Sequence, residues 1–342
     1  MMSYKRFDAE DVVVSAESIS TPVWTGDVTT LETFFTSSTQ IGATSADYYF
    51  DIYNTGSNIQ GSRVQFSVAY ADEKGSGSLL YNSNVTGKSP SSTIYGQYRN
   101  LVLGDEDSAF TFGTETSEHF YVLAVDRARY KEKLLPGTLD LKLMISASGA
   151  SINLTDNSRL VTTATFADAG RVYDLVSGSL GVLSTGAKNT SGYTATAGSY
   201  GKLLPDVGLI ILNGKALDAT VSDGGIALNT TRTADSVGNN LGKIYNVIRD
   251  GAKFRVQSEE TITSNFVFVR ARNSEFNYST NPSLITGSGE IRHNVMVNSP
   301  QSYITAVGLY NDNNDLLAVA KLSRPLLKDF TKESLVRIKL DY

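Results

Sequence analysis

The sequence predicts a mainly β protein, built from antiparallel β-sandwich or barrel domains with two or three short helices. In the segment 63–70, Val64, Phe66 and Val68 alternate with polar residues, which is the period of a strand with two unlike faces. Near the C-terminus, two apolar runs flank a short polar turn, which is typical of a β-hairpin. Helical periodicity is confined to two segments of about three turns each.

Strands are expected wherever a short apolar or aromatic run is bounded by turn residues. Pro136-Gly137 is one such turn, and Asn54-Thr55-Gly56-Ser57 is another. The strands expected in this way cover residues 47–53, 63–70, 109–112, 120–125, 139–145, 207–212 and 266–269.

Two helices are expected from apolar spacing and end signals. Before the first helix, Ser89 is a candidate N-cap and Pro90 suits the first helical position, while Gly104 suits the end. The second helix ends before Gly251. The apolar positions are Ile94, Tyr98, Leu101 and Val102 in the first helix, and Leu241, Ile244, Tyr245 and Ile248 in the second.

The C-terminal segment carries the clearest pattern. The runs 303–310 and 315–322 flank Asn311-Asp312-Asn313-Asn314, whose side chains bond their own backbone and tolerate the left-handed conformation. A link that contains Pro325 is expected to follow. In the last segment, 334–342, apolar and charged residues alternate, so it is expected to be a strand with one wet face.

A chain of 342 residues is too long for one ordinary core, so several domains are expected. Changes in composition along the chain suggest a β-rich N-terminal domain over residues 1–165 and a Gly-, Ser- and Thr-rich inserted lobe over 166–258. A C-terminal β domain over 259–342 completes this division. The N-terminal arm, 1–14, lacks a core pattern until Val12 and is expected to order only on binding.

The charge pattern disfavours nucleic acid as a partner, because the net charge is −5 and no basic stripe is present. The chain holds no cysteine, which excludes disulfides and thiolate chemistry. Neither a signal peptide nor an apolar run of the roughly 20 residues that span a bilayer is expected, so no membrane partner is predicted.

Motifs for catalysis, cofactors and metals are weak, and none of these sites is predicted. The two histidines, His119 and His293, lie in different segments without zinc-ligand spacing. The segment 181–188 lacks the Gly-Lys-Ser/Thr ending of a phosphate loop, and 311–315 lacks the glycine and glutamate of a calcium loop. The acidic run 105–107 is expected to be a solvated loop.

Two other features fit a surface that is covered by partners. The basic run 127–133 can meet an acidic surface, although a charged turn is the simpler interpretation. Tyrosine, with 18 residues, outnumbers phenylalanine, and tyrosine suits surfaces that are buried on assembly. The tyrosines considered are Tyr48, Tyr49, Tyr53, Tyr95, Tyr98, Tyr303 and Tyr310.

Four segments resemble a family of virion structural proteins from contractile-tailed bacteriophages, of the cyanophage type. These segments are 88–99, 127–137, 275–282 and 303–330, and the last resembles a module shared by tail and baseplate proteins. The resemblance implies a noncatalytic virion component of the tail or baseplate. It implies assembly in the host cytoplasm, self-association in a symmetric assembly, and other tail or baseplate subunits as partners.

An interface is predicted on the C-terminal segment. The stretch 273–282 follows a strand without periodicity, and we expect it to be a docking loop on a neighbouring subunit. Its sequence also suits an intramolecular crossover. The predicted interface residues are Glu275, Phe276, Asn277, Tyr278, Asn281, Pro282, Tyr303 and Tyr310.

Three alternatives remain open at this point. One is a receptor-binding tail fibre or adhesin, which would form a stable, SDS-resistant trimer alone. Another is a neck or other tail-associated protein, which the sequence does not distinguish from a tail or baseplate subunit. A glycan depolymerase would use paired acids such as Glu259, Glu260 or those at 105–107. The lack of a β-helix repeat counts against the depolymerase.

Overall fold

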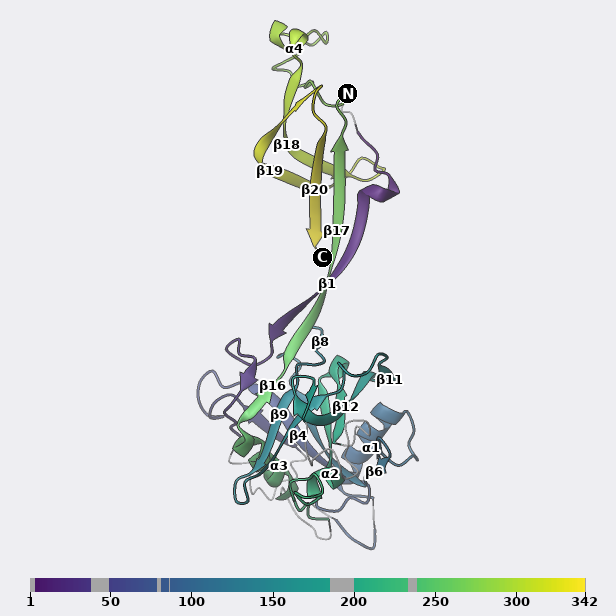
Figure 1. The fold of residues 1–342 in the computed structure, drawn as a ribbon, viewed down its shortest axis with the longest axis vertical. Coiled ribbons are helices and arrows are strands. Elements are labelled where there is room, and N and C mark those ends of the chain that lie inside the picture. The colour runs from purple at the N-terminus through teal and green to yellow at the C-terminus, as the bar shows by residue number, and fades with distance from the viewer. Residues whose placement is uncertain are drawn as a thin grey trace. The chain divides into compact units, whose positions relative to one another are not determined.

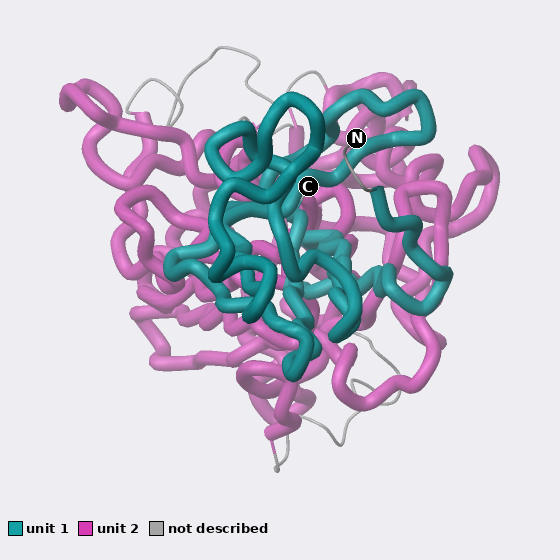
Figure 2. Tube along the Cα trace, turned by 90° about the horizontal axis from the view of Figure 1, so that it is seen from above, with its two compact units in different colours: residues 1–18, 261–342 teal, residues 19–260 magenta. Residues whose placement is uncertain are grey.

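In the computed structural model, residues 4–37, 49–78, 81–85, 87–184, 200–232 and 239–341 are described. The chain forms two compact units (Figure 2). Residues 1–18 and 261–342 form one unit, here called the terminal unit, and residues 19–260 form the other, here called the central unit. Tyr48 and part of the Gly- and Ser-rich middle segment lie outside the described residues.

The predicted fold class is confirmed, because the molecule is mainly β and its sheets are antiparallel. The central unit is organised around one large sheet, with β11 and β13 added beside β12. Along the sheet the order is β2 (Thr30–Leu31), β16 (Lys253–Arg255), β9 (Asp140–Ile145), β10 (Ala150–Asp156), β12 (Gly170–Ser179), β14 (Gly201–Leu204), β15 (Leu209–Asn213), β7 (His119–Val125), β4 (Val64–Asp72) and β3 (Tyr49–Tyr53). The short strands are β5 (Thr111–Phe112), β6 (Glu115–Thr116), β8 (Lys133–Leu134), β11 (Thr165–Ala167) and β13 (Val182–Leu183).

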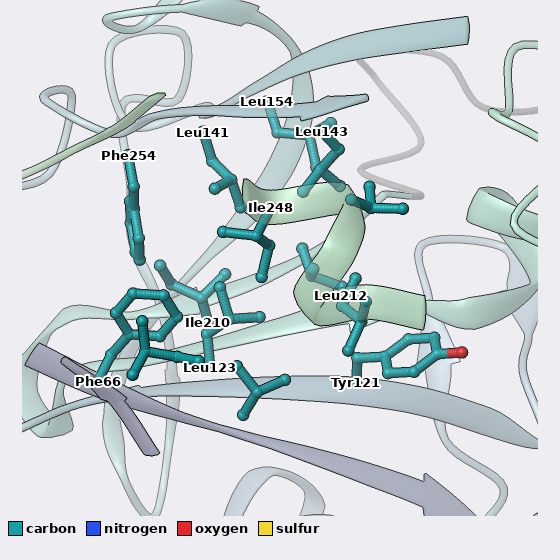
Figure 3. Close-up of a cluster of buried hydrophobic side chains, with 14 of the residues drawn as sticks. Phe66, Tyr121, Leu123, Leu141, Leu143, Leu154, Ile210, Leu212, Ile248 and Phe254 are labelled. Carbon is teal, nitrogen blue, oxygen red and sulfur yellow. The ribbon is translucent and has the colours of Figure 1, made fainter. Parts of the chain in front are cut away.

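Both faces of this sheet are buried by different layers. In β7, Tyr121 and Leu123 belong to one apolar cluster, whereas Phe120 and Val122 belong to another. The first cluster is covered by helix α3 (Asn239–Gly251), whose Ile248 points among the sheet residues in Figure 3. The second is covered by helix α1 (Pro90–Leu103). Burial on both faces explains the nearly continuous apolar runs of β7 and β15.

Both predicted helices are present, and their end signals act as expected with one exception. Gly104 follows α1 with a left-handed φ of 65°, and its N–H donates to Asn100 O. Ser89 occupies the N-cap position, but its hydroxyl donates to Gly75 O and leaves the helix uncapped by a side chain. The sequence did not predict α2 (Gly214–Asp218), α4 (Asn294–Asn298) or the 3-10 helices η1 (Ala9–Asp11) and η3 (Pro205–Val207), which are too short to show a period.

The terminal unit is a small two-layer structure (Figure 1). One layer contains β1 (Val12–Pro22), β17 (Gln257–Ala271) and β20 (Ser334–Asp341), in that order, and β1 and β17 each begin or end in the central unit. The other layer is the hairpin of β18 (Gln301–Tyr310) and β19 (Leu316–Asp329). The two layers meet through Val267, Leu309 and Ile338.

The predicted C-terminal pattern is confirmed. Asn314 has a φ of 65°, and Oδ1 of Asn311 accepts from the N–H groups of Asn313 and Asp315 at 3.0 and 2.7 Å. The predicted wet face of β20 is exposed, whereas Ile338 and its neighbours at 336 and 340 face the hairpin.

Two expectations about this region are wrong. Pro325 lies inside β19 and not in a link, because a β-bulge shifts the register between Ile304 and Ala306 and leaves the proline unpaired. The N-terminal arm is not free of the fold, since Tyr4 packs against Tyr310 and Lys5 Nζ donates to Arg270 O at 2.5 Å.

The predicted domain boundaries also differ from the compact units. Residues 166–258 do not form a separate lobe, because β12, β14 and β15 lie between β10 and β7 in the sheet. Residues 1–165 are divided at Ser18, and the division at Glu260 lies close to the expected boundary at 258/259. Local amino-acid composition could not predict this division, because the division arises from backbone pairing between segments that are distant in the sequence.

Candidate interface of the terminal unit

The predicted docking loop is held in place by a buried lysine. Lys328 is fully buried, and its Nζ donates to Asn273 O at 3.0 Å, to Asn277 Oδ1 at 2.7 Å and to Asp329 O at 2.9 Å. All three ammonium hydrogens therefore have acceptors, which offsets the cost of burying the charge. Asn277 Nδ2 also donates to Asn273 O at 2.7 Å. The side chain of Asn277, a predicted interface residue, therefore holds the loop and is not presented to solvent.

The other predicted loop residues are exposed or partly exposed. Phe276 has a left-handed φ of 56°, and its carbonyl accepts from Ser302 Oγ. Tyr278 is 61% exposed. Asn281 and Pro282 begin a turn at the surface, where Asn281 Oδ1 accepts from Ser283 N. The loop thus presents aromatic side chains from a fixed backbone.

Glu275 is half-buried at the base of this loop. Its carboxylate accepts from Arg272 N at 2.8 Å and from Lys5 Nζ at 3.1 Å. The N–H of Arg272, followed by the ammonium of Lys5, holds the pKa of Glu275 below its usual value. Glu275 therefore anchors the N-terminal arm as an ionised carboxylate.

The two predicted tyrosines lie at opposite ends of β18. Tyr303 is next to Ser302 and so lies beside the loop, whereas Tyr310 lies at the hairpin turn. Around Tyr310 is an apolar surface, here called the hairpin face, which consists of Tyr4, Tyr310, Leu316, Leu317 and Val319. The Tyr4 and Tyr310 rings meet edge to face at 5.2 Å between centroids.

The hairpin face faces away from the core of the terminal unit. Leu309 and Ala318 face the opposite layer, so their strand neighbours Tyr310, Leu317 and Val319 point outward. Gly308 pairs with Val319, and the Tyr310 ring lies over it: a Cβ at Gly308 would meet Tyr310 Cε2 at 2.9 Å. The glycine thus makes room for the tyrosine ring on an exposed apolar surface.

The terminal unit exposes many large apolar side chains, although its buried apolar core is small. More than half of the exposed large apolar side chains of the described residues lie in it, although it contains fewer than a third of the chain. Its apolar cluster has three buried members, whereas the central clusters are far larger. The exposed aromatics are Tyr4, Phe7, Phe276, Tyr278, Tyr303, Tyr310 and Phe330.

A polar network of the central unit is the strongest candidate for chemistry. His119 begins β7, is nearly buried, and its Nε2 lies 2.9 Å from Asp218 Oδ2. Asp218 Oδ1 accepts from Thr230 Oγ1 at 2.8 Å, and that hydroxyl lies 2.9 Å from Tyr121 OH. Burial raises the pKa of Asp218, but the hydrogen bonds from His119 and Thr230 outweigh burial and lower it.

A second group of charges continues this network. Asp72 is fully buried and accepts from Arg232 Nε at 2.8 Å and from the N–H groups of Lys74 and Ser76 at 3.0 Å. Arg232 also pairs with Glu118 at 2.8 Å. These contacts fasten the segment before α3 to the end of the sheet, so the network is explained by folding.

The other residues considered for chemistry are separate from one another. Glu259 and Glu260 pair with Lys133 and Lys131, each at 3.8 Å, and the acidic run 105–107 is an exposed turn. Among the described residues, no group of three or more acidic or histidine side chains is arranged to hold a metal. The same part of the chain contains no helix that is both long and apolar enough to cross a bilayer.

Several residues that define the candidate interface of the terminal unit were not predicted from the sequence. Lys328 resembled any exposed lysine, and only its tertiary contacts distinguish it. Leu316 and Leu317 both lie on the exposed hairpin face, because the register shifts between Leu309 and Tyr310, and alternation along the strand does not predict this. Of the other tyrosines considered, Tyr95 is on the buried face of α1 and belongs to the core.

Comparison with family models, with curated proteins and with solved structures finds no match to this chain.

Proposed function

We propose that the protein is a noncatalytic structural subunit of a bacteriophage virion, most consistent with a tail or baseplate position, and that it acts through interfaces of its terminal unit. The observation that carries the proposal is the excess of exposed apolar surface over buried core in that unit. The resemblance of segments 88–99, 127–137, 275–282 and 303–330 to virion proteins points in the same direction.

The exposed aromatic area of the terminal unit, summed over all of its faces, is comparable with the area of one interface. The seven exposed aromatics, scaled to about 200 Å² for a whole side chain, present about 700 Å² over the terminal unit. A standard interface buries about 800 Å² per partner. The fixed loop around Phe276 and Tyr278 adds to the suitability for docking, because a backbone that is already held in place loses little entropy on binding.

Mass spectrometry of purified phage particles tests the proposal. The protein should be present in mature particles at a fixed copy number, and density for its sheets should be visible in a cryo-EM map of the particle. Its absence from mature particles, or turnover of a substrate by the free protein, would contradict the proposal. An SDS-resistant trimer of the free chain that binds host cells would favour the receptor-binding fibre instead.

A further inference from the structure

The terminal unit has a second exposed surface whose chemistry differs from that of the hairpin face. In the register of β17 and β20, Phe266 pairs with Lys339 and Phe268 pairs with Arg337. The intervening pair, Val267 and Ile338, faces the hairpin, so these four side chains lie on the outer face of the sheet. Together with Arg270, two residues further along β17, they are here called the basic sheet face.

The cations of this face lie over an aromatic ring. Arg337 Cζ is 5.4 Å from the centroid of Phe266, and Lys339 Nζ is 6.0 Å from the same centroid. The two phenylalanines are half-buried, whereas Arg270, Arg337 and Lys339 are exposed. A guanidinium that rests on an aromatic ring is held in a defined orientation while its hydrogen-bond donors stay available.

Carboxylates are scarce on the basic sheet face. Lys339 pairs with Asp341 at 3.1 Å, and Asp341 also accepts from Ser264 Oγ at 2.5 Å. Within the described ranges, Arg270 and Arg337 form no ion pair. Exposed arginine beside half-buried aromatic rings is the composition of an interface centre, and its natural counterpart is a carboxylate.

Symmetric pairing of β20 with β20 of another copy is disfavoured by these charges. An antiparallel pairing that keeps the faces in register, centred on Ile338, would place Arg337 opposite Lys339 of the other copy. Like charges directly opposite in a ladder are destabilising. The exposed cations of this face favour an acidic segment as its occupant.

The chain itself contains a segment with this chemistry. Asp105, Glu106 and Asp107 follow α1 and are all exposed. Asp107 N donates to Asp105 Oδ1 at 2.8 Å, which fixes the turn. None of the three forms an ion pair with a cation of the described residues. Three carboxylates on one turn match the three cations of the basic sheet face.

We propose that the basic sheet face binds the acidic turn 105–107 of a second copy of this chain. The proposal rests on the proposed function, in which the protein acts through interfaces of its terminal unit, and it names two surfaces that meet. Because the face and the turn are different surfaces, one in each unit, the contact can form a ring or a filament, or can form twice in a reciprocal twofold pair.

Charge reversal on each side tests the contact. One variant carries Arg337→Glu and Lys339→Glu, and the other carries Glu106→Lys and Asp107→Lys. Each variant alone has surfaces of like charge and should self-associate about tenfold more weakly than the wild type at low salt. An equimolar mixture should recover wild-type association, because each surface then meets its complement. Sedimentation velocity at 50 and 500 mM NaCl measures these states.

A control with the same charge change, Arg6→Glu with Lys332→Glu, reverses exposed cations of the terminal unit outside this face and should keep wild-type association. The contact is overturned if the mixture stays dissociated while the wild type associates, if the first variant associates normally, or if the wild type does not associate at low salt. Recovery in the mixture also shows that both variants are folded. Presence of the protein in virions is measured separately, so the proposed function can stand when this contact fails.

Discussion

The central unit and the terminal unit place their apolar residues differently. In the central unit, strands such as β7 bury side chains on both faces under α3 and α1. In the terminal unit, two thin layers bury three apolar side chains between them and leave Leu317 68% and Phe330 64% exposed. Under the proposed function, partner subunits cover the apolar side chains that these layers leave exposed.

The two units also differ in what their charged side chains hold in place. In the central unit, Asp72, Arg232 and Glu118 fasten one segment to the sheet. In the terminal unit, Lys328 fastens the docking loop. Each group of contacts joins segments of a single unit, but only the contacts of Lys328 lie beneath an exposed loop. The comparison teaches that a unit with a small apolar core can hold an exposed loop in place through the hydrogen bonds of one buried lysine.

Phe254→Ala should have the largest effect on stability. Phe254 is fully buried with its ring 4.9 Å from that of Trp24, and the truncation should lower the free energy of unfolding by about 4 kcal/mol. Trp24 is the single tryptophan, so its fluorescence in urea reports on the central unit. Phe330→Ala, at an exposed site of the terminal unit, should change the same transition by less than about 0.5 kcal/mol. Equal effects would contradict the comparison.

Lys328→Ala should have the next largest effect, confined to the terminal unit. The change removes the lysine donor of Asn277 Oδ1 and Asp329 O and one of the two donors of Asn273 O, at a cost of about 2 kcal/mol. Hydrogen exchange should show faster exchange over residues 272–282. Lys332→Ala is the matched control, since Lys332 is exposed and its carboxylate contact to Asp329 is 3.7 Å. Unchanged exchange in the loop would show that Lys328 does not hold it.

Asp218→Asn should give a smaller, pH-dependent effect in the central unit. The pKa of Asp218 is lowered in the fold below its usual 3.8, because the bonds from His119 and Thr230 outweigh burial. Its ionised form therefore contributes stability at pH values above 3.8, and this contribution is lost as the pH falls through the lowered pKa. Urea unfolding should show a wild-type advantage at pH 6 that shrinks below pH 3.8. A constant difference across this range would refute the assignment.

Leu316→Ser with Val319→Ser should have almost no effect on the stability of the free chain, because both side chains are exposed. The double variant should weaken self-association by about tenfold, since it removes apolar area from the hairpin face. Sedimentation velocity measures the change. The control, Val182→Ser with Val221→Ser, alters exposed valines of the central unit and should leave association unchanged. An equal loss of association in both double variants would contradict the conclusion that the exposed apolar side chains of the terminal unit, and not those of the central unit, form an interface.

Much of the local structure was predictable because it depends on near neighbours in the chain. The turn at 311–314 follows from Asn311, whose side chain bonds backbone groups two and four residues later. Helix α1 follows from Pro90 and Gly104 at its ends. The bulge at Pro325 was not predictable, because the residues opposite it come from another strand.

The candidate interface was predicted only in part. The sequence identified Tyr278, Tyr303 and Tyr310, which are exposed, but it also included Asn277, which is buried. Whether an asparagine in a loop faces inward depends on a lysine that is 51 residues away, and no local pattern carries that information.

The sequence by itself determined the strand periods, the hairpin turn and both longer helices, since alternation, end residues and turn chemistry act over a few positions. Only the tertiary structure decided that β12, β14 and β15 complete the central sheet and that β20 pairs with β17. It also decided that Arg337 and Lys339 gather around Phe266. Such pairings join residues far apart in the chain, and their free energy comes from burial and backbone hydrogen bonds that exist only once the segments meet.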